Sequence, residues 1–116
     1  MTTDTTETAT AAGQIAAAGA LLAIVHAHRA LPTPSPELRE ISAAGTWSWG
    51  VRLSLHDGLD QFEQWRDALA LDPADVNRKH SYGGNLAWLI VTGTAYGVPV
   101  ELVGYYYLPE PATTWS

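Results

Sequence analysis

The stretch that decides the fold is the carboxyl-terminal run NLAWLIVTGTA-YG-VPVELVGYYYL, residues 85–108. Two apolar segments of similar length flank Tyr96-Gly97, and a two-residue turn of this kind joins antiparallel strands. We predict a β-hairpin whose cross-strand pairs, counted from the turn, are Ala95 with Val98, Ile90 with Val103, Trp88 with Tyr105, and Leu86 with Tyr107. Because Pro99 has no amide hydrogen, we expect the second strand to lie at the sheet edge near its start.

Both faces of this hairpin are apolar, because side chains alternate between the two faces of a strand. Leu89, Val91, Val100 and Leu102 fall on one face. The opposite face, which we call the aromatic face, carries Leu86, Trp88, Ile90, Val103, Tyr105 and Tyr107. One short helix can cover only one of these faces, and large exposed apolar patches are uncommon on monomers. We therefore expect the amino-terminal helix, a second subunit or another partner to cover the aromatic face.

The residues before the hairpin indicate two strands and one helix. Residues 46–56 alternate between apolar and polar side chains, which predicts a half-buried strand, and residues 38–42 form a shorter candidate strand. Apolar residues at helical spacing predict a helix over 58–71, with Asp57 as its cap. Asp72-Pro73 predicts a helical turn through Val76, and residues 77–81 read as a loop. The fold class that follows is α+β, with a ββαββ core that makes a four-stranded antiparallel sheet and packs one helix on it.

The amino-terminal third divides into three segments. Residues 1–8 are rich in threonine and are expected to be a disordered tail. Residues 9–31 are rich in alanine and predict a helical arm with Leu21, Ile24 and Val25 on one face. Three prolines between 32 and 36 make a linker. The core domain then spans 37–110, and residues 111–116 form a second tail.

Composition and charge exclude or disfavour several classes of protein and of binding site. The chain has no cysteine, which excludes disulfides and thiolate metal sites, and its net charge of -6 disfavours general binding to nucleic acid or anionic lipid. Its apolar segments are too short to span a membrane, and its first eight residues lack the basic region of a signal peptide. We expect a cytoplasmic protein with no membrane association.

Six acidic residues between 57 and 75, with Arg66 as the only cation there, form a solvated helix face or, alternatively, a surface for a basic partner.

No stretch amounts to a catalytic, cofactor or metal motif. His56-Asp57 is the best acid/base candidate, although the simpler role for Asp57 is the helix cap. Two histidines at 26 and 28 fall on different sides of a helix, so they do not share a metal. The segment Arg78-Lys79-His80 is the only local basic patch, and with the tyrosines it could contact a nucleic acid. We therefore expect no cofactor and no metal.

Three stretches resemble a known group of sequences. They are FEQWRDAL at 62–69, DPADV at 72–76 and TGTAYGVPV at 92–100. Their order is similar to that in small uncharacterised actinobacterial proteins, which are often carried by phages and integrative elements. The resemblance covers roughly residues 45–108 and implies a genomic context, with no activity or functional residue to carry over.

These observations favour a non-enzymatic protein-interaction or regulatory module that forms a homodimer or binds another protein. The interface residues that we predict are the six of the aromatic face together with Leu21, Ile24 and Val25. A nucleic-acid-binding regulator that uses Arg78 and Lys79 is one alternative. A small enzyme that uses His56 and Asp57 is another.

Overall fold

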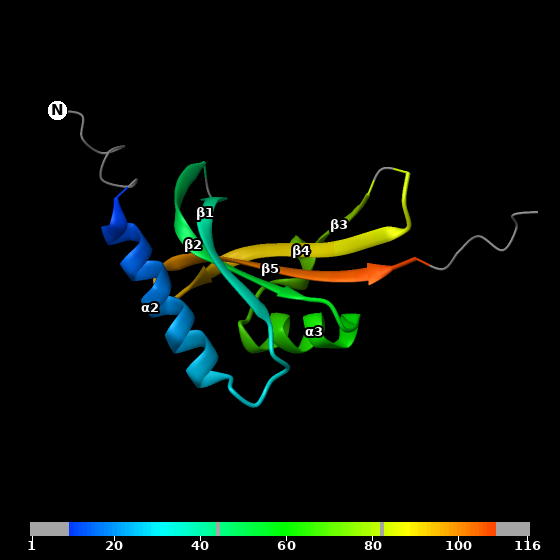
Figure 1. Ribbon diagram of the computed structural model, residues 1–116, viewed down its shortest axis with the longest axis horizontal. Coiled ribbons are helices and arrows are strands. Elements are labelled where there is room, and N and C mark those ends of the chain that lie inside the picture. Colours follow the sequence, from blue (N-terminus) through cyan, green and yellow to red (C-terminus); the bar gives the residue numbers. More distant parts are fainter. Residues whose placement is uncertain (1–9, 44, 82, 109–116) are drawn as a thin grey trace, which may run out of the picture.

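The computed structural model describes residues 10–43, 45–81 and 83–108, so the predicted tails at 1–8 and 111–116 lie outside it. The elements are α2 (Ala11–Ala27), β1 (Ser35–Ala43), β2 (Thr46–Leu55), α3 (Leu59–Ala68), a 3-10 turn η1 (Pro73–Asp75), β3 (Asn77–His80), β4 (Leu86–Ala95) and β5 (Val98–Tyr107). The strands form one sheet in the order β1-β2-β5-β4-β3 (Figure 1). The α+β class is confirmed, and Ser35 and Pro36 lie in β1 rather than in a linker.

The β4–β5 hairpin has the predicted register. The pairs Ala95–Val98, Ile90–Val103, Trp88–Tyr105 and Leu86–Tyr107 are all present. Tyr96 and Gly97 both have positive φ angles, 53° and 81°, as a type I′ turn requires. The turn therefore sets which side chains share each face of the hairpin.

The prediction of a four-stranded antiparallel sheet is wrong in two respects. First, the segment predicted as a loop at 77–81 contains β3, which pairs antiparallel with β4. Its four side chains are all exposed, so it has no alternation of apolar and polar residues and is held by backbone pairing at the sheet edge. Second, β2 and β5 are parallel neighbours, which makes the sheet mixed.

β5 is a central strand, but Pro99 near its start pairs with Thr94 of β4 and precedes the ladder with β2, so it lies at a local edge as expected. Its missing amide is tolerated because the ladder between β2 and β5 begins at Val100, one residue later. Gly50 provides the room for this approach, since a Cβ atom there would lie 2.2 Å from the carbonyl oxygen of Pro99. Two residues far apart in the sequence thus allow β5 to join the middle of the sheet.

Both helices pack on the same face of the sheet (Figure 1). α2 contributes Ala17, Ala20 and Ile24 to the core, and α3 contributes Phe62 and Trp65. Beneath them lie Val51, Leu53 and Leu55 of β2, Val98, Val100 and Leu102 of β5, and Val91 of β4. The Nε1–H of Trp65 donates to the carbonyl oxygen of Pro32 at 2.8 Å, and the ring of His28 meets that of Trp65 edge-on. The helix at the amino-terminal side is therefore part of the core, and neither helix of the described ranges covers the aromatic face of the hairpin.

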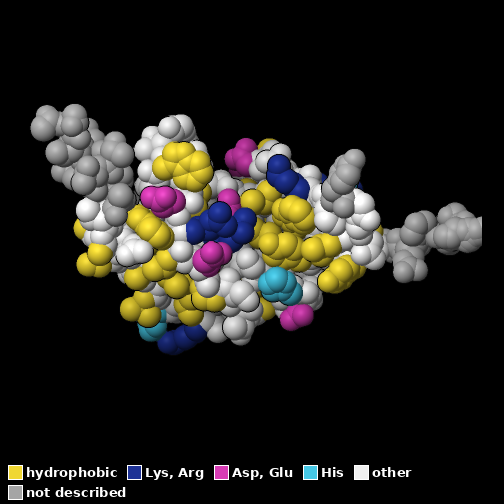
Figure 2. Space-filling model, turned by 45° about the horizontal axis from the view of Figure 1, so that its top comes forward, with side chains coloured by type: hydrophobic (Ala, Val, Ile, Leu, Met, Phe, Trp, Pro, Cys, Tyr) yellow, Lys and Arg dark blue, Asp and Glu magenta, His cyan; other side chains and the backbone are white. Residues whose placement is uncertain are grey.

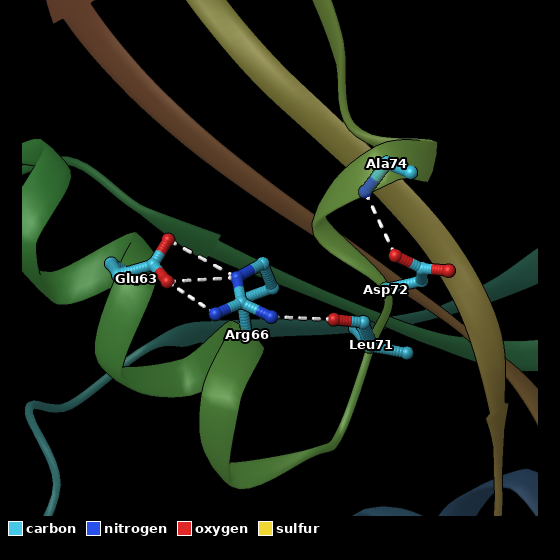
Figure 3. A network of polar contacts seen from close by, with 5 residues as sticks. All are labelled: Glu63, Arg66, Leu71, Asp72 and Ala74. Atoms are coloured by element: carbon cyan, nitrogen blue, oxygen red, sulfur yellow. Dashed lines mark hydrogen bonds and ion pairs between the residues drawn. The ribbon is translucent and has the colours of Figure 1, made fainter.

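The ends of α3 differ from the prediction. Gly58, rather than Asp57, is the residue at the N-cap, and no side chain bonds there. At the other end the Leu71 amide donates to the carbonyl of Arg66 and the Ala70 amide to that of Asp67, which is a Schellman motif. Asp72 accepts a bond from the Ala74 amide at 2.9 Å, which confirms the predicted cap before Pro73 (Figure 3). The Schellman motif ends α3 at Ala68, three residues before the predicted end.

Candidate functional site: an uncovered aromatic sheet face

The candidate site is the face of the sheet opposite the two helices. Cross-strand register places all six predicted residues of the aromatic face there, together with Ser54 and Arg52 of β2 and Lys79 of β3. Figure 2 shows hydrophobic side chains gathered on the face turned to the viewer, with Lys or Arg and His side chains beside them. Tyr107 is 74% exposed, and Leu86, Trp88, Ile90 and Tyr105 are half-buried, whereas Val103 is buried. Tyr107 is therefore exposed on this face, beside four aromatic or aliphatic side chains that are partly exposed.

Three rings make contact across three strands of this face. His56, which directly follows β2, stacks on Tyr105 of β5 with a centroid distance of 4.9 Å and an interplanar angle of 5°. Tyr105 in turn contacts Trp88 of β4 at 5.9 Å and 45°. The parallel pairing of β2 with β5 brings His56 to this position, because Leu55 is the Cα partner of Gly104. The sequence indicated His56 only as an acid/base candidate, and the stack was missed because it depends on this strand pairing.

A pocket of about 240 Å³ opens beside the stack. It is lined by His56, Leu86, Tyr105 and Tyr107. Asp57 does not line it, so the carboxylate expected to assist His56 is not part of this cavity. The structure thus places His56 against the ring of Tyr105 at the edge of this pocket.

The charges on the aromatic face are nearly balanced. Strand register puts three cations (Arg39, Arg52 and Lys79) and two carboxylates (Glu37 and Glu101) on it. The guanidinium Nε of Arg52 donates to Glu101 Oε1 at 2.7 Å, and these two side chains are only 22% and 16% exposed. This ion pair is already satisfied within the chain.

The helix side is acidic by contrast. The six acidic residues between 57 and 75 are all exposed. Glu63 is hydrogen-bonded and ion-paired with Arg66, which lowers the pKa of the Glu63 carboxyl and raises that of Arg66 (Figure 3). Arg66 also donates through Nη1 to the Leu71 carbonyl at 2.6 Å, beyond the end of α3. Part of the acidic cluster therefore supports the local structure of α3 and η1.

The other predicted site residues are dispersed. Ile24 is wholly buried in the core of the described chain, and Leu21 packs against the same core. Val25 is 38% exposed on α2. The predicted basic patch is divided, because Lys79 shares a face with Trp88 whereas Arg78 points to the helix side with Leu89.

Comparisons with protein-family models, with curated proteins and with solved structures find no match. Among the residues that the structure describes, no three His, Asp or Glu side chains gather as ligands for a metal ion. No helix within the described ranges is both long and apolar enough to cross a bilayer. The argument for function therefore depends on the geometry of the aromatic face.

Proposed function

We propose that the protein is a non-enzymatic interaction module that self-associates through its aromatic face. The observation that carries this proposal is the position of both helices on one face of the sheet, so that no described element covers Trp88, Tyr105 and Tyr107. Tryptophan and tyrosine are enriched at the centres of protein interfaces and contribute most of the binding energy there.

A second copy of the chain is the partner that the charges favour. A two-fold arrangement places the same patch on both sides of the contact, so the patch must be compatible with itself. A face with nearly equal numbers of cations and carboxylates meets this condition. Arg52 and Glu101 already neutralise each other, which reduces the penalty of burying these two ions. Self-association through the acidic helix side would instead bring like charges together.

The resemblance to actinobacterial proteins of phages and integrative elements supports a role in a mobile genetic element. In that setting the dimer is an accessory or regulatory protein of a mobile element, located in the cytoplasm. Nucleic acid is not the favoured partner, because Lys79 is the one residue of the predicted basic patch that shares the aromatic face.

The test compares two tryptophan-to-alanine variants by light scattering and sedimentation. The native chain, with a monomer mass of 12.5 kDa, should have twice that mass at micromolar concentration. Trp88→Ala should weaken the dimer about thirtyfold, as the loss of a central aromatic residue does. Trp47→Ala is the matched control, because Trp47 is 64% exposed but lies on the other face of β2, and it should leave the mass unchanged.

A native chain that is monomeric at high micromolar concentration would contradict self-association. So would equal masses for the Trp88 variant and the native protein, provided that circular dichroism shows both to be folded. Retardation of a single-stranded oligonucleotide at low salt by a monomeric chain would assign the face to nucleic acid instead.

A further inference from the structure

We infer that the pocket beside the His56–Tyr105 stack binds a free, uncharged planar nitrogen heterocycle such as a nucleobase or nucleoside. The site lies at one end of the aromatic face and shares Tyr105 and Tyr107 with the surface proposed for self-association, so the ligand and a second copy of the chain compete for these two residues. Its lining pair Leu86–Tyr107 is the last cross-strand pair of the β4–β5 hairpin, ten residues along each strand from the turn at Tyr96-Gly97.

Ring geometry favours a planar ligand. The imidazole of His56 and the phenol ring of Tyr105 are parallel within 5°, so a third planar ring can extend the stack. Tyr107 borders the same pocket, is 74% exposed and contacts no other ring in the described part of the chain. One face of its ring is therefore accessible to a ligand.

The polar groups of the lining favour a heterocycle over a hydrocarbon ring. His56, Tyr105 and Tyr107 each carry a nitrogen or hydroxyl at the ring edge, and the described residues give these groups no hydrogen-bond partner. A nucleobase has donors and acceptors at its own edge and can pair with them. A phenyl ring would leave them unpaired, which costs binding energy if they are desolvated.

Size and charge favour a small neutral molecule over a polynucleotide. A volume of about 240 Å³ is below the roughly 300–1,000 Å³ of pockets that hold drug-sized ligands or cofactors, and it suits one ring system. Among the described residues no Lys or Arg lines the pocket, and the chain has a net charge of -6, so a phosphate backbone lacks the cations that hold it.

The test is a titration of the full chain with adenosine, followed by proton NMR of the His56 and Tyr105 rings. Stacking should move their resonances upfield in a saturable manner. His56→Ala should weaken binding about tenfold or more, as the loss of one stacking partner does. His80→Ala is the matched control, because His80 is exposed on β3 and lies on the other face, and it should bind like the native chain.

Three further probes make the result decisive. Ribose, which lacks the base, and N-acetylphenylalanine amide, which lacks the polar ring edge, should bind at least tenfold more weakly than adenosine. A single-stranded oligoadenylate should bind no more tightly per base than adenosine does. Absence of saturable adenosine shifts, unchanged binding by His56→Ala, equal binding of ribose or the phenylalanine amide, or binding of the oligonucleotide alone would each overturn the inference. Light scattering on the same samples reports self-association separately.

Discussion

At the scale of single residues, Gly50 decides whether β5 can pair with β2 near Pro99. A Cβ atom on residue 50 would lie 2.2 Å from the Pro99 carbonyl oxygen, which is backbone and cannot rotate away. Gly50→Ala should therefore lower the free energy of unfolding by about 1–3 kcal/mol, the usual cost of overpacking. Urea denaturation, followed by tryptophan fluorescence, measures this change in the free energy of unfolding.

The control for this substitution is the same change in α2. A Cβ atom on Gly19 would meet nothing within 4 Å, and the helix gains conformational order when glycine is replaced by alanine. Gly19→Ala should raise the free energy of unfolding by about 0.5–1 kcal/mol. If the two substitutions shift stability in the same direction, the close approach at Gly50 is not what limits this position.

The carboxylate of Glu63 makes a small contribution to stability that depends on pH. Pairing with Arg66 lowers the pKa of Glu63 in the folded state below the ordinary 4.5, so the folded state favours the ionised form. The contribution is present above pH 4.5 and is lost as the pH falls through the lowered pKa. Glu63→Gln should thus melt slightly below the native chain at pH 7, with a difference that vanishes near pH 3 and shrinks in high salt. A difference that is constant from pH 7 to pH 3 would rule out this linkage.

At the scale of elements, the end of α3 places an alanine where glycine is preferred. Ala70 is the residue after the C-cap and has φ of 57°, a left-handed conformation that costs a residue with a Cβ atom about 1–2 kcal/mol. Ala70→Gly removes this strain but adds flexibility to the unfolded chain, so we expect a net gain of about 0.5–1 kcal/mol. Thermal unfolding followed by circular dichroism measures the gain.

The neighbouring Ala68 is the control, because it lies within α3 and has ordinary helical geometry. Ala68→Gly should lower stability by up to about 1 kcal/mol. A stabilising effect at both positions, or at neither, would mean that the left-handed residue does not define the helix end.

The elements that could be predicted from sequence are those with a local signal. The hairpin register follows from the Tyr96-Gly97 turn, and the pairing of Leu86 with Tyr107 follows from the turn by counting. β3 has no such signal, because Asn77 to His80 are all exposed and are held by backbone bonds to β4. The parallel pairing of β2 with β5 also gave no sequence signal, since it joins two strands that are separated along the chain by α3, η1, β3 and β4.

At the scale of the whole molecule, the site also has parts with a local sequence signal and parts without one. The division of the hairpin into two apolar faces could be read from alternation, and so could the membership of Trp88 and Tyr105 in the aromatic face. The face on which the helices pack could not be predicted, because α2 buries small residues such as Ala17 and Ala20 that carry little sequence signal. The stack of His56 on Tyr105 was equally hidden, because it requires the β2–β5 pairing.

The position of α2 in the core leads to the last prediction, which concerns whether the chain unfolds as one unit. Ile24 is 0% exposed against the sheet, whereas Leu22, two residues earlier on the same helix, is 72% exposed. Ile24→Ala should lower the free energy of unfolding by about 2–5 kcal/mol, and Leu22→Ala should change it by less than about 0.5 kcal/mol.

Because Trp65 of α3 donates to the Pro32 carbonyl and contacts His28, the loss at Ile24 should appear in both helices at once. Denaturation followed by far-UV circular dichroism and by tryptophan fluorescence should then give coincident transitions for the native chain and for Ile24→Ala, with the variant shifted to lower urea. If α2 behaved as a separate arm, the fluorescence transition of Ile24→Ala would instead stay unchanged. The sheet face under α2 would then also lack a firmly packed cover.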